Sequence, residues 1–297
     1  MIKKFLLAIF CLVLLLVLIY AALIYENNRD TAPVSQQGLK ASLENATQWA
    51  VNNREAILEQ NSAMLWWWIK RSAEISNDYR LLKLYKDYHQ RYIDSNYASV
   101  WRPLFTQSVA PTNLPERLMK FPDYNIYFIY GFTCDQTLAE LPIVRAQMGD
   151  NFCADEHPVS PACVTHQLMG LRFRQQSQCG DRDAMAQQVS VLQSKIERQL
   201  TRDPRVVDVY IQRVLMLADT GAAEKLSPVW VSRVLEYQNV DGGWGGFQPV
   251  IGLAGGKSLG FSARSLTVSE PKSTFHATAQ GILLMTLLLN ELEASSD

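Results

Sequence analysis

The sequence carries almost no net charge. Its 28 lysines and arginines nearly balance 29 aspartates and glutamates, which gives a formal net charge of −1. A chain so close to neutrality produces no long-range field that would favour nucleic acid or another strongly charged surface. The sequence also lacks an H-E-x-x-H pair, an E-x-x-H metal motif and a phosphate-binding loop. We therefore expect no nucleic-acid partner, no metal site and no cofactor.

Residues 5–25 contain no charged side chain at all. As a helix rising about 1.5 Å per residue, such a run matches the roughly 30 Å hydrocarbon core of a bilayer. A cleavable signal peptide has a shorter apolar run that ends in small residues, whereas bulky Leu23 and Ile24 follow the small pair here. The sequence therefore predicts an uncleaved anchor. A cleaved signal peptide is the alternative, and it would leave the compartment unchanged.

Charges flank the apolar run unequally. Lys3 and Lys4 precede it, and Glu26 follows it. Positive residues stay on the cytoplasmic side, so the N-terminus is expected in the cytoplasm. We predict a cytoplasmic stub and transmembrane anchor over 1–25, a single pass of the inner (cytoplasmic) membrane, and a periplasmic main domain.

Cysteine is scarce, and Cys11 lies within the anchor. Clustered cysteines outside the cytoplasm are typical of disulfides, and four of them allow three pairings that the sequence does not rank. The alternative is a zinc site built from Cys153-x3-His157-x5-Cys163-x2-His166, although this spacing matches no standard zinc finger. The clustered cysteines are Cys134, Cys153, Cys163 and Cys179.

Apolar residues recur at helical spacing along most of the chain, which predicts an all-α protein. Pro204 and Pro228, preceded by Asp203 and Ser227, are expected to start two helices, and Ser273 is expected to cap the last one. Residues 124–132 fit either a short strand or the start of a helix. The expected organisation is a polar linker at 26–37, an N-terminal helical region at 38–102, and a C-terminal helical domain at 103–297, with glycine-rich turns at 242–246 and 252–260.

Three consecutive indoles, Trp66, Trp67 and Trp68, lie in the helical region at 64–93. Successive helical residues are about 100° apart, so all three cannot face one side of the helix. We expect core packing against two neighbouring elements. Contact with a ligand or partner is the alternative.

One motif is specific. The run from Gln238 to Trp244 has the form Q-x-x-D-G-G-W and is followed by a helix that begins around His276. It resembles the repeat of the terpene cyclase and prenyltransferase superfamily, whose fold is an α/α-toroid of inner and outer helices. The resemblance implies a toroid-like domain in which the Gln and Trp bind neighbouring repeats together. The superfamily's D-x-D-D acid motif, aspartate-rich motif and Asp-x-Cys zinc signature are absent, so its chemistries do not transfer.

The resemblance also suggests a site. His276, and His166 in a weaker echo of the same pattern, would lie in first turns of inner helices at the mouth of a central cavity. Neutral histidines there would serve as general acid or base, with satisfied polar residues as the alternative. We further predict ligand binding by side chains around the motif and beyond His166, namely Asp241, Trp244, Tyr237 and Arg172. For Asp241 and Trp244, a structural role is the alternative.

Two functions remain open. The first is an anchored binding or scaffold module that recognises a glycan, peptide or envelope protein through an aromatic-lined cavity. The second is a carbohydrate-active lyase or hydrolase that uses the two histidines. An enzyme should bring His166, His276 and a Tyr, Asp or Glu to one pocket, whereas a scaffold should scatter the histidines.

Overall fold

The computed structural model describes residues 2–106, 108, 110–153 and 161–294. Within that part of the chain, nearly all regular structure is helical, which confirms the all-α class. The longest helices are α1 (Ile2–Asn28), α12 (Arg182–Arg202) and α15 (Phe275–Ala294). The others are α2 (Gln36–Asn52), α3 (Arg54–Leu58), α4 (Ala63–Ser76), α5 (Tyr79–Tyr88), η1 (His89–Asp94), α6 (Arg102–Phe105), α7 (Leu114–Leu118), α8 (Asp123–Thr133), α9 (Gln136–Ala139), α10 (Pro142–Gln147), α11 (Cys163–Gln176), α13 (Asp208–Asp219), η2 (Ala223–Lys225), α14 (Pro228–Glu236) and η3 (Ala254–Gly256).

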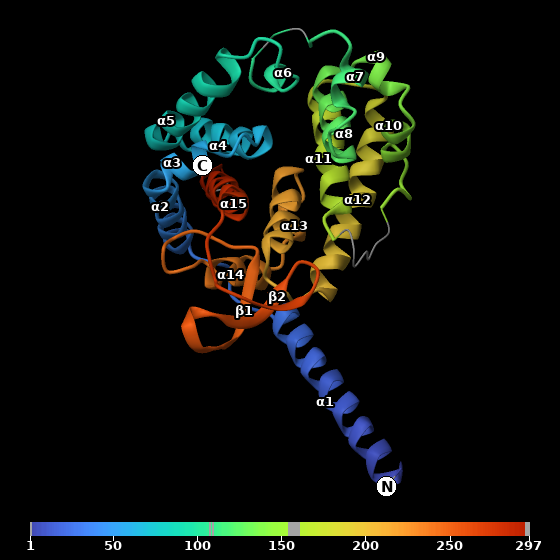
Figure 1. Cartoon of the computed structure of the whole chain (residues 1–297), viewed down its shortest axis with the longest axis vertical. Coiled ribbons are helices and arrows are strands. Elements are labelled where there is room, and N and C mark those ends of the chain that lie inside the picture. Colours follow the sequence, from blue (N-terminus) through green and yellow to red (C-terminus); the bar gives the residue numbers. More distant parts are fainter. Residues whose placement is uncertain (1, 107, 109, 154–160, 295–297) are drawn as a thin grey trace.

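Helix α1 projects from the helical body (Figure 1). Its segment Ile9–Asn28 is long and apolar enough to cross a membrane, with a mean hydropathy of 2.6. By length and composition alone, such a helix fits an anchor or a signal sequence. Two disulfides, Cys134–Cys179 and Cys153–Cys163, confirm the predicted use of the cysteines and fit an oxidising compartment.

The end of α1 is inserted into the body rather than followed directly by a loop. Asn27 is fully buried. Its side-chain amide donates to the Leu200 carbonyl at 2.6 Å, and its side-chain oxygen accepts from the Tyr210 hydroxyl at 3.0 Å and from Arg233. The Trp230 indole donates to the Asn27 carbonyl at 3.0 Å. Residues 26–28 of the predicted linker are therefore the last turn of α1.

The body has two rows of helices. In the inner row, α15 packs against α4 and α13, and α11 packs against α13 and α8. Outside them, α5 covers α4, α2 covers α15, α12 covers α11 and α10 covers α8 (Figure 1). Close packing around α15 is possible because Ala277, Ala279 and Gly281 are buried on it. The paired rows suit the predicted toroid, but ring closure remains a prediction.

The N-terminal and C-terminal parts share one core. Helices α2 and α4, from the region predicted at 38–102, pack directly on α15 at the other end of the chain. The larger of two apolar clusters runs from Leu39 to Leu289, and the smaller one lies within residues 100–144. The expected parts at 38–102 and 103–297 therefore pack as one body.

The three indoles of α4 are all buried, as expected for core packing. Trp66 stacks on Tyr88 with ring centroids 4.9 Å apart, and Trp67 meets Phe173 edge-on at 4.9 Å. Trp68 lines a cavity described below. Because the three rings point in different directions, α4 is held by outer and inner neighbours at once.

Residues 124–132 belong to helix α8, so the helix alternative for this segment is confirmed. Two other local predictions need correction. Helix α13 begins at Asp208, four residues after Pro204, because Asp203 pairs with Arg205 and Arg213 instead of capping a helix. Ser273 does not cap α15: the Thr274 hydroxyl accepts from the Ala277 amide at 3.2 Å. Ser227 does stand before α14, with Pro228 as its first residue.

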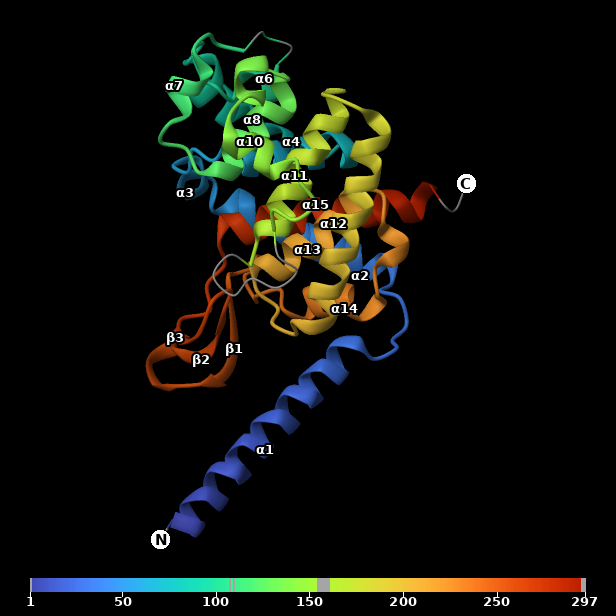
Figure 2. The ribbon, with the colours of Figure 1, turned by 90° about the vertical axis from the view of Figure 1, so that its right-hand side faces the viewer.

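The glycine-rich region contains a small sheet that the sequence did not predict. Strands β1 (Phe247–Gly252), β2 (Ser258–Ser262) and β3 (Leu266–Ser269) form an antiparallel meander in that order. A bulge between Pro249 and Ile251 shifts the β1–β2 register. The sheet projects from the same side of the body as α1 (Figures 1 and 2).

Candidate ligand-binding cleft

Two adjoining hollows lie at one end of the inner helices. The larger is about 760 Å³ and the smaller about 610 Å³. They share four lining residues, so we treat them together as the central cleft. The shared residues are Tyr124, His166, Gln212 and His276. The structure therefore brings both predicted histidines to one site.

All five inner helices present their first turns to this cleft. Lining residues include Met64 of α4, Tyr124 of α8, His166 of α11, Asp208 of α13 and His276 of α15. The first four amides of a helix have no partner within the helix, and their dipoles sum to partial positive charge. The fold thus aims five positive helix ends at one space.

The inner helices mostly lack side-chain caps at these ends. In the described part of the chain, the N-cap side chains of α4, α8, α11 and α13 accept no hydrogen bond from their helix. Three outer helices differ: Ser35, Asp78 and Asp181 cap α2, α5 and α12. Several amides facing the cleft are therefore left for water or a ligand, although Asp208 accepts from the Val209 amide at the start of α13, and outer helices α10 and α14 lack side-chain caps as well.

His276 lies at the opening of the cleft beside a carboxylate. Its Nδ1 is 3.4 Å from Asp208 Oδ2, and its side chain is 47% exposed. The Nε2 atom lies 3.4 Å from the side-chain nitrogen of buried Gln280. The tautomer that satisfies both neighbours has its proton on Nδ1, with Nε2 as the acceptor. Asp208 thus orients the imidazole of His276 in the way that a carboxylate orients a histidine that acts as a general base.

His166 lies deeper, against aromatic rings. It stacks on Tyr124 with ring centroids 4.3 Å apart and meets the edge of Phe128 at 6.0 Å. Burial, with a smaller contribution from nearby His276, lowers the pKa of His166 to about 4, while Asp208 opposes the shift. At neutral pH the ring is therefore uncharged and can accept or donate one hydrogen bond.

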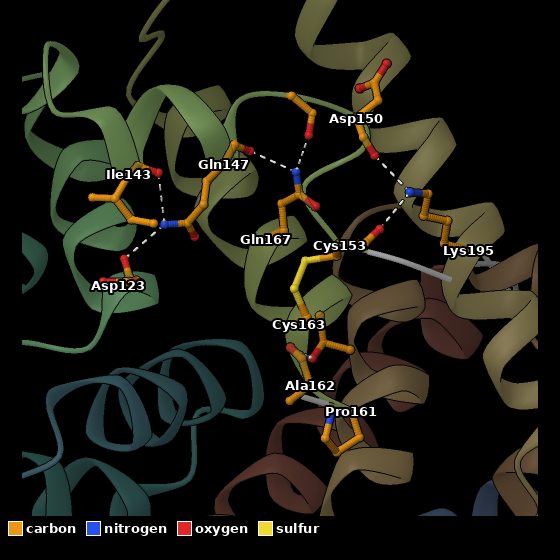
Figure 3. The surroundings of a disulfide bond; sticks show 12 residues. Asp123, Ile143, Gln147, Asp150, Cys153, Pro161, Ala162, Cys163, Gln167 and Lys195 are labelled. Carbon is orange, nitrogen blue, oxygen red and sulfur yellow. Dashed lines mark hydrogen bonds between the residues drawn. A yellow bond between two sulfur atoms is a disulfide. The ribbon is translucent and has the colours of Figure 1, made fainter. Parts of the chain in front are cut away.

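A network behind the cleft fixes the first turns of α8 and α11 (Figure 3). The Gln147 amide donates to the Asp123 carbonyl at 3.0 Å, and the Gln167 amide donates to the Gln147 carbonyl at 2.8 Å. The disulfide ties Cys153 to the first residue of α11, and the buried Lys195 ammonium donates to the Cys153 carbonyl at 2.9 Å. These contacts hold the backbone that carries Tyr124 and His166.

Aromatic side chains line the larger hollow from several elements. They give it broad apolar faces between polar groups, a composition typical of ligand sites. Positive side chains, Arg117 and Lys120, stand exposed in its lining, and Arg264 does so in the smaller hollow. The aromatic residues are Trp68, Tyr92, Trp101, Phe121, Tyr124 and Phe128.

The Q-x-x-D-G-G-W motif holds helices together away from the cleft. The Asp241 carboxylate accepts from the Trp49 indole at 3.1 Å and from the Ser273 hydroxyl at 2.6 Å, which joins three segments. The Trp244 indole is buried and donates to the Val234 carbonyl at 2.7 Å. A Cβ at Gly281 would lie 2.4 Å from the Trp244 ring, so glycine is required there. These contacts favour the structural alternative for both motif residues.

Neither of the other two predicted binding residues lines the central cleft. Arg172 pairs with buried Asp219, which also pairs with Arg71 at 2.6 Å, so the cluster joins α11, α13 and α4. The Tyr237 hydroxyl accepts from Gln248 at 2.7 Å. Tyr237, Asp241 and Trp244 border a separate hollow of about 440 Å³. The four predicted binding residues therefore lie outside the cleft that contains His166 and His276.

Sequence reasoning missed Asp208, Tyr124 and Gln212 as cleft residues. Asp208 was misplaced because α13 was expected to start at Pro204, and Tyr124 because 124–132 fitted strand or helix equally. An acidic residue directly before an apolar helical run was the available signal for Asp208. The run from Gly256 to Gly260 has the letters G-x-S-x-G, but Ser258 starts a hairpin strand and no helix follows it, so it is no nucleophile elbow.

The zinc alternative loses two of its ligands, because the Cys153 and Cys163 sulfurs bond to each other. His157, its third member, lies outside the described residues. Comparison of the chain with protein-family models, with curated proteins and with solved structures gives no match in any of the three. The terpene cyclase and prenyltransferase resemblance therefore remains a prediction carried by the motif alone.

Proposed function

We propose that this protein is a membrane-anchored domain that binds an acidic glycan in the central cleft, on the periplasmic side of the inner membrane. The observation that carries the proposal is the convergence of five inner-helix first turns, four of them without a side-chain cap, on an aromatic-lined hollow. Anionic groups suit such helix ends, and aromatic faces suit sugar rings.

Charge at the cleft favours a carboxylated or sulfated ligand over a neutral one. Arg117, Lys120 and Arg264 stand at its walls and attract anions, whereas His166 stays uncharged and offers a hydrogen bond instead of a positive charge. Each helix end contributes about 0.3–1 kcal/mol to a nearby anion at low ionic strength. Asp123 and Asp208 lie only in the smaller hollow, so the acidic groups are expected to bind in the larger one.

The membrane orientation belongs to the same proposal. Lys3 and Lys4 before α1 favour a cytoplasmic N-terminus. The helical body would then lie in the periplasm, where its two disulfides form. Because Asn27 is buried in the body, the cleft is held at a fixed orientation to the anchor instead of swinging on a linker.

A binding experiment tests the ligand class. We expect the full-length protein in nanodiscs to bind polygalacturonate and sheared peptidoglycan more tightly than neutral dextran, with affinity that falls as salt is added. Trp101→Ala and Tyr124→Ala should weaken binding at least tenfold, because each removes a stacking face. Tyr79→Ala, which alters a 75% exposed tyrosine outside the cleft, is the control. Equal binding of dextran, or unchanged affinity in both cleft variants, would contradict the proposal.

Acid–base cleavage of the bound glycan is the second candidate function. The observation that favours it is His276 beside Asp208 in the same cleft as His166 and Tyr124. An enzyme is expected to bring both histidines and a Tyr, Asp or Glu to one pocket, and the central cleft contains such a group. His276 would move a proton through Nε2 once the Gln280 amide releases that atom, and Asp208 would hold the ring.

This candidate predicts that His276→Ala leaves the fold intact and abolishes formation of new reducing ends from a glycan that the protein cleaves. His89→Ala is the matched control, because His89 does not line the cleft. Circular dichroism reports the fold of both variants. Unchanged cleavage by the His276→Ala variant would remove His276 from the reaction.

A further inference from the structure

The β1–β3 sheet has one apolar face. In antiparallel strands, directly opposed residues point to the same side. Leu259 is opposed by Val268 and Ile251, and Phe261 is opposed by Leu266, so five apolar side chains share a face. At the base of that face Gln248, which also opposes Phe261, is buried and accepts from the Val206 amide. Across the sheet, β2 presents Ser258, Gly260 and Ser262 instead.

The outer part of this apolar face is exposed, whereas Leu259 and Phe261 are half-buried. Ile251 is 55% exposed, Leu266 59% and Val268 52%, and Val250 and Leu253 at the end of the hairpin are exposed as well. Apolar side chains gathered on one projecting element mark an interaction surface rather than ordinary surface composition. The sheet projects away from the helical body (Figure 2).

The position of α1 identifies what covers the face. Both views place the sheet and α1 on the same side of the body (Figures 1 and 2). The body cannot turn away from α1, because Asn27 is buried in it and the Tyr20 hydroxyl donates to the Arg202 carbonyl at 2.9 Å. Tyr20 and Tyr25 are residues of the type that sits at membrane interfaces. A bilayer crossed by α1 would therefore face the sheet.

Charge around the sheet suits lipid headgroups. Between 247 and 272 the basic residues are Lys257, Arg264 and Lys272, and the acidic residue is Glu270, which pairs with Lys272. Lys257 and Arg264 thus flank the apolar face with positive charge, which anionic headgroups attract. The outer edges of β1 and β3 carry unpaired backbone groups, so the sheet belongs in the hydrated interfacial layer and not in the hydrocarbon core.

We propose that the apolar face of the β1–β3 sheet lies in the interfacial layer of the bilayer that α1 crosses, with anionic headgroups beside Lys257 and Arg264. The inference rests on the membrane anchor of the proposed function and shares Arg264 with the wall of the smaller hollow, whereas Lys257 lines neither hollow of the cleft. It gives the domain a second membrane contact besides α1.

Site-specific fluorescence in nanodiscs tests this contact. The full-length protein, incorporated at one chain per disc, is labelled with an environment-sensitive dye at native Cys11 or, in a Cys11→Ser background, at Ile251→Cys or Val268→Cys. Thr267→Cys, on the other face of β3, is the matched control, and Tyr79→Cys reports water exposure. We expect blue-shifted emission, and quenching by lipids brominated near the headgroup, at Cys11, Ile251→Cys and Val268→Cys but not at the controls. Replacing anionic by zwitterionic lipid should reduce the shift at the two sheet positions alone.

The outcomes separate the anchor from the sheet. A buried label at Cys11 together with water-exposed labels at both sheet positions overturns the sheet contact and leaves the anchor standing. A water-exposed label at Cys11 overturns both. Shielding of Ile251→Cys that appears only with several chains per disc assigns the face to a second copy of the protein and also overturns the proposal.

Discussion

At the scale of the residue, the two cleft histidines differ in environment although their sequence contexts are alike. His166 is enclosed by Tyr124 and Phe128, whereas His276 stands at the opening with Asp208. The shared pattern of a hydroxyl residue, a histidine and a small residue predicted that both would lie at helix starts. It did not predict which would be enclosed, because the enclosing rings come from α8, far away in the sequence.

The buried histidine makes stability depend on pH. Since the pKa of His166 falls from 6.5 to about 4 on folding, the unfolded chain binds more protons between those values. The stability gained from the neutral ring is complete above pH 6.5 and is lost as the pH falls toward 4, by up to about 3 kcal/mol. Urea unfolding across that range measures it. His166→Gln should flatten this part of the profile, and an unaltered profile in that variant would assign the pH dependence to other groups.

At the scale of the element, the convergence of the uncapped starts of α4, α8, α11 and α13 on one cleft is the feature that most favours an anionic ligand. Outer helices α2, α5 and α12 are capped by their own Ser or Asp side chains. Helix α11 instead starts at a disulfide, so its first turn is held covalently while its amides stay uncapped. The disulfide thus holds the first turn of α11 in place, and the backbone amides of that turn are available to a ligand.

Removal of that disulfide tests its role. Cys153→Ser together with Cys163→Ser should lower the free energy of unfolding by about 3 kcal/mol, the value expected for a loop of this length from chain entropy. Chemical denaturation measures the loss. Glycan affinity should fall as well, because the start of α11 loses its covalent support. Full affinity in the double variant would show that the Gln147–Gln167 network alone positions α11.

Local signals explain what the sequence could predict. The uncharged run at 5–25 predicted α1, and Pro228 predicted the start of α14, because the length of an apolar run and the fixed φ of a first-turn proline act locally. The Ser227 side chain makes no cap hydrogen bond to α14. The start of α13 could not be predicted, since Asp203 is used by Arg213 in the folded core. The sheet was missed because its strands are short and rich in glycine and serine, and its apolar face becomes visible only once the register of β2 is known.

At the scale of the whole molecule, the protein consists of an anchor, a rigid helical body and a cleft that are held together by buried polar contacts. Asn27 holds α1 in the body, the Asp219 cluster ties the far ends of α4, α11 and α13, and the near ends of the same helices form the cleft. The resemblance to a toroid superfamily led to this site, because it placed both histidines at inner-helix starts. The ligand class follows instead from the charges and rings of this chain.

Histidine resonances provide the most direct test of the central claim that acidic glycans bind at the inner-helix starts. Imidazole signals of the full-length protein would be followed by NMR during titration with oligogalacturonate. We expect the His166 and His276 signals to move together with one dissociation constant, while the His89 signal, outside the cleft, stays fixed. Binding of the oligosaccharide with no movement of His166 and His276, or with equal movement of His89, would contradict the account.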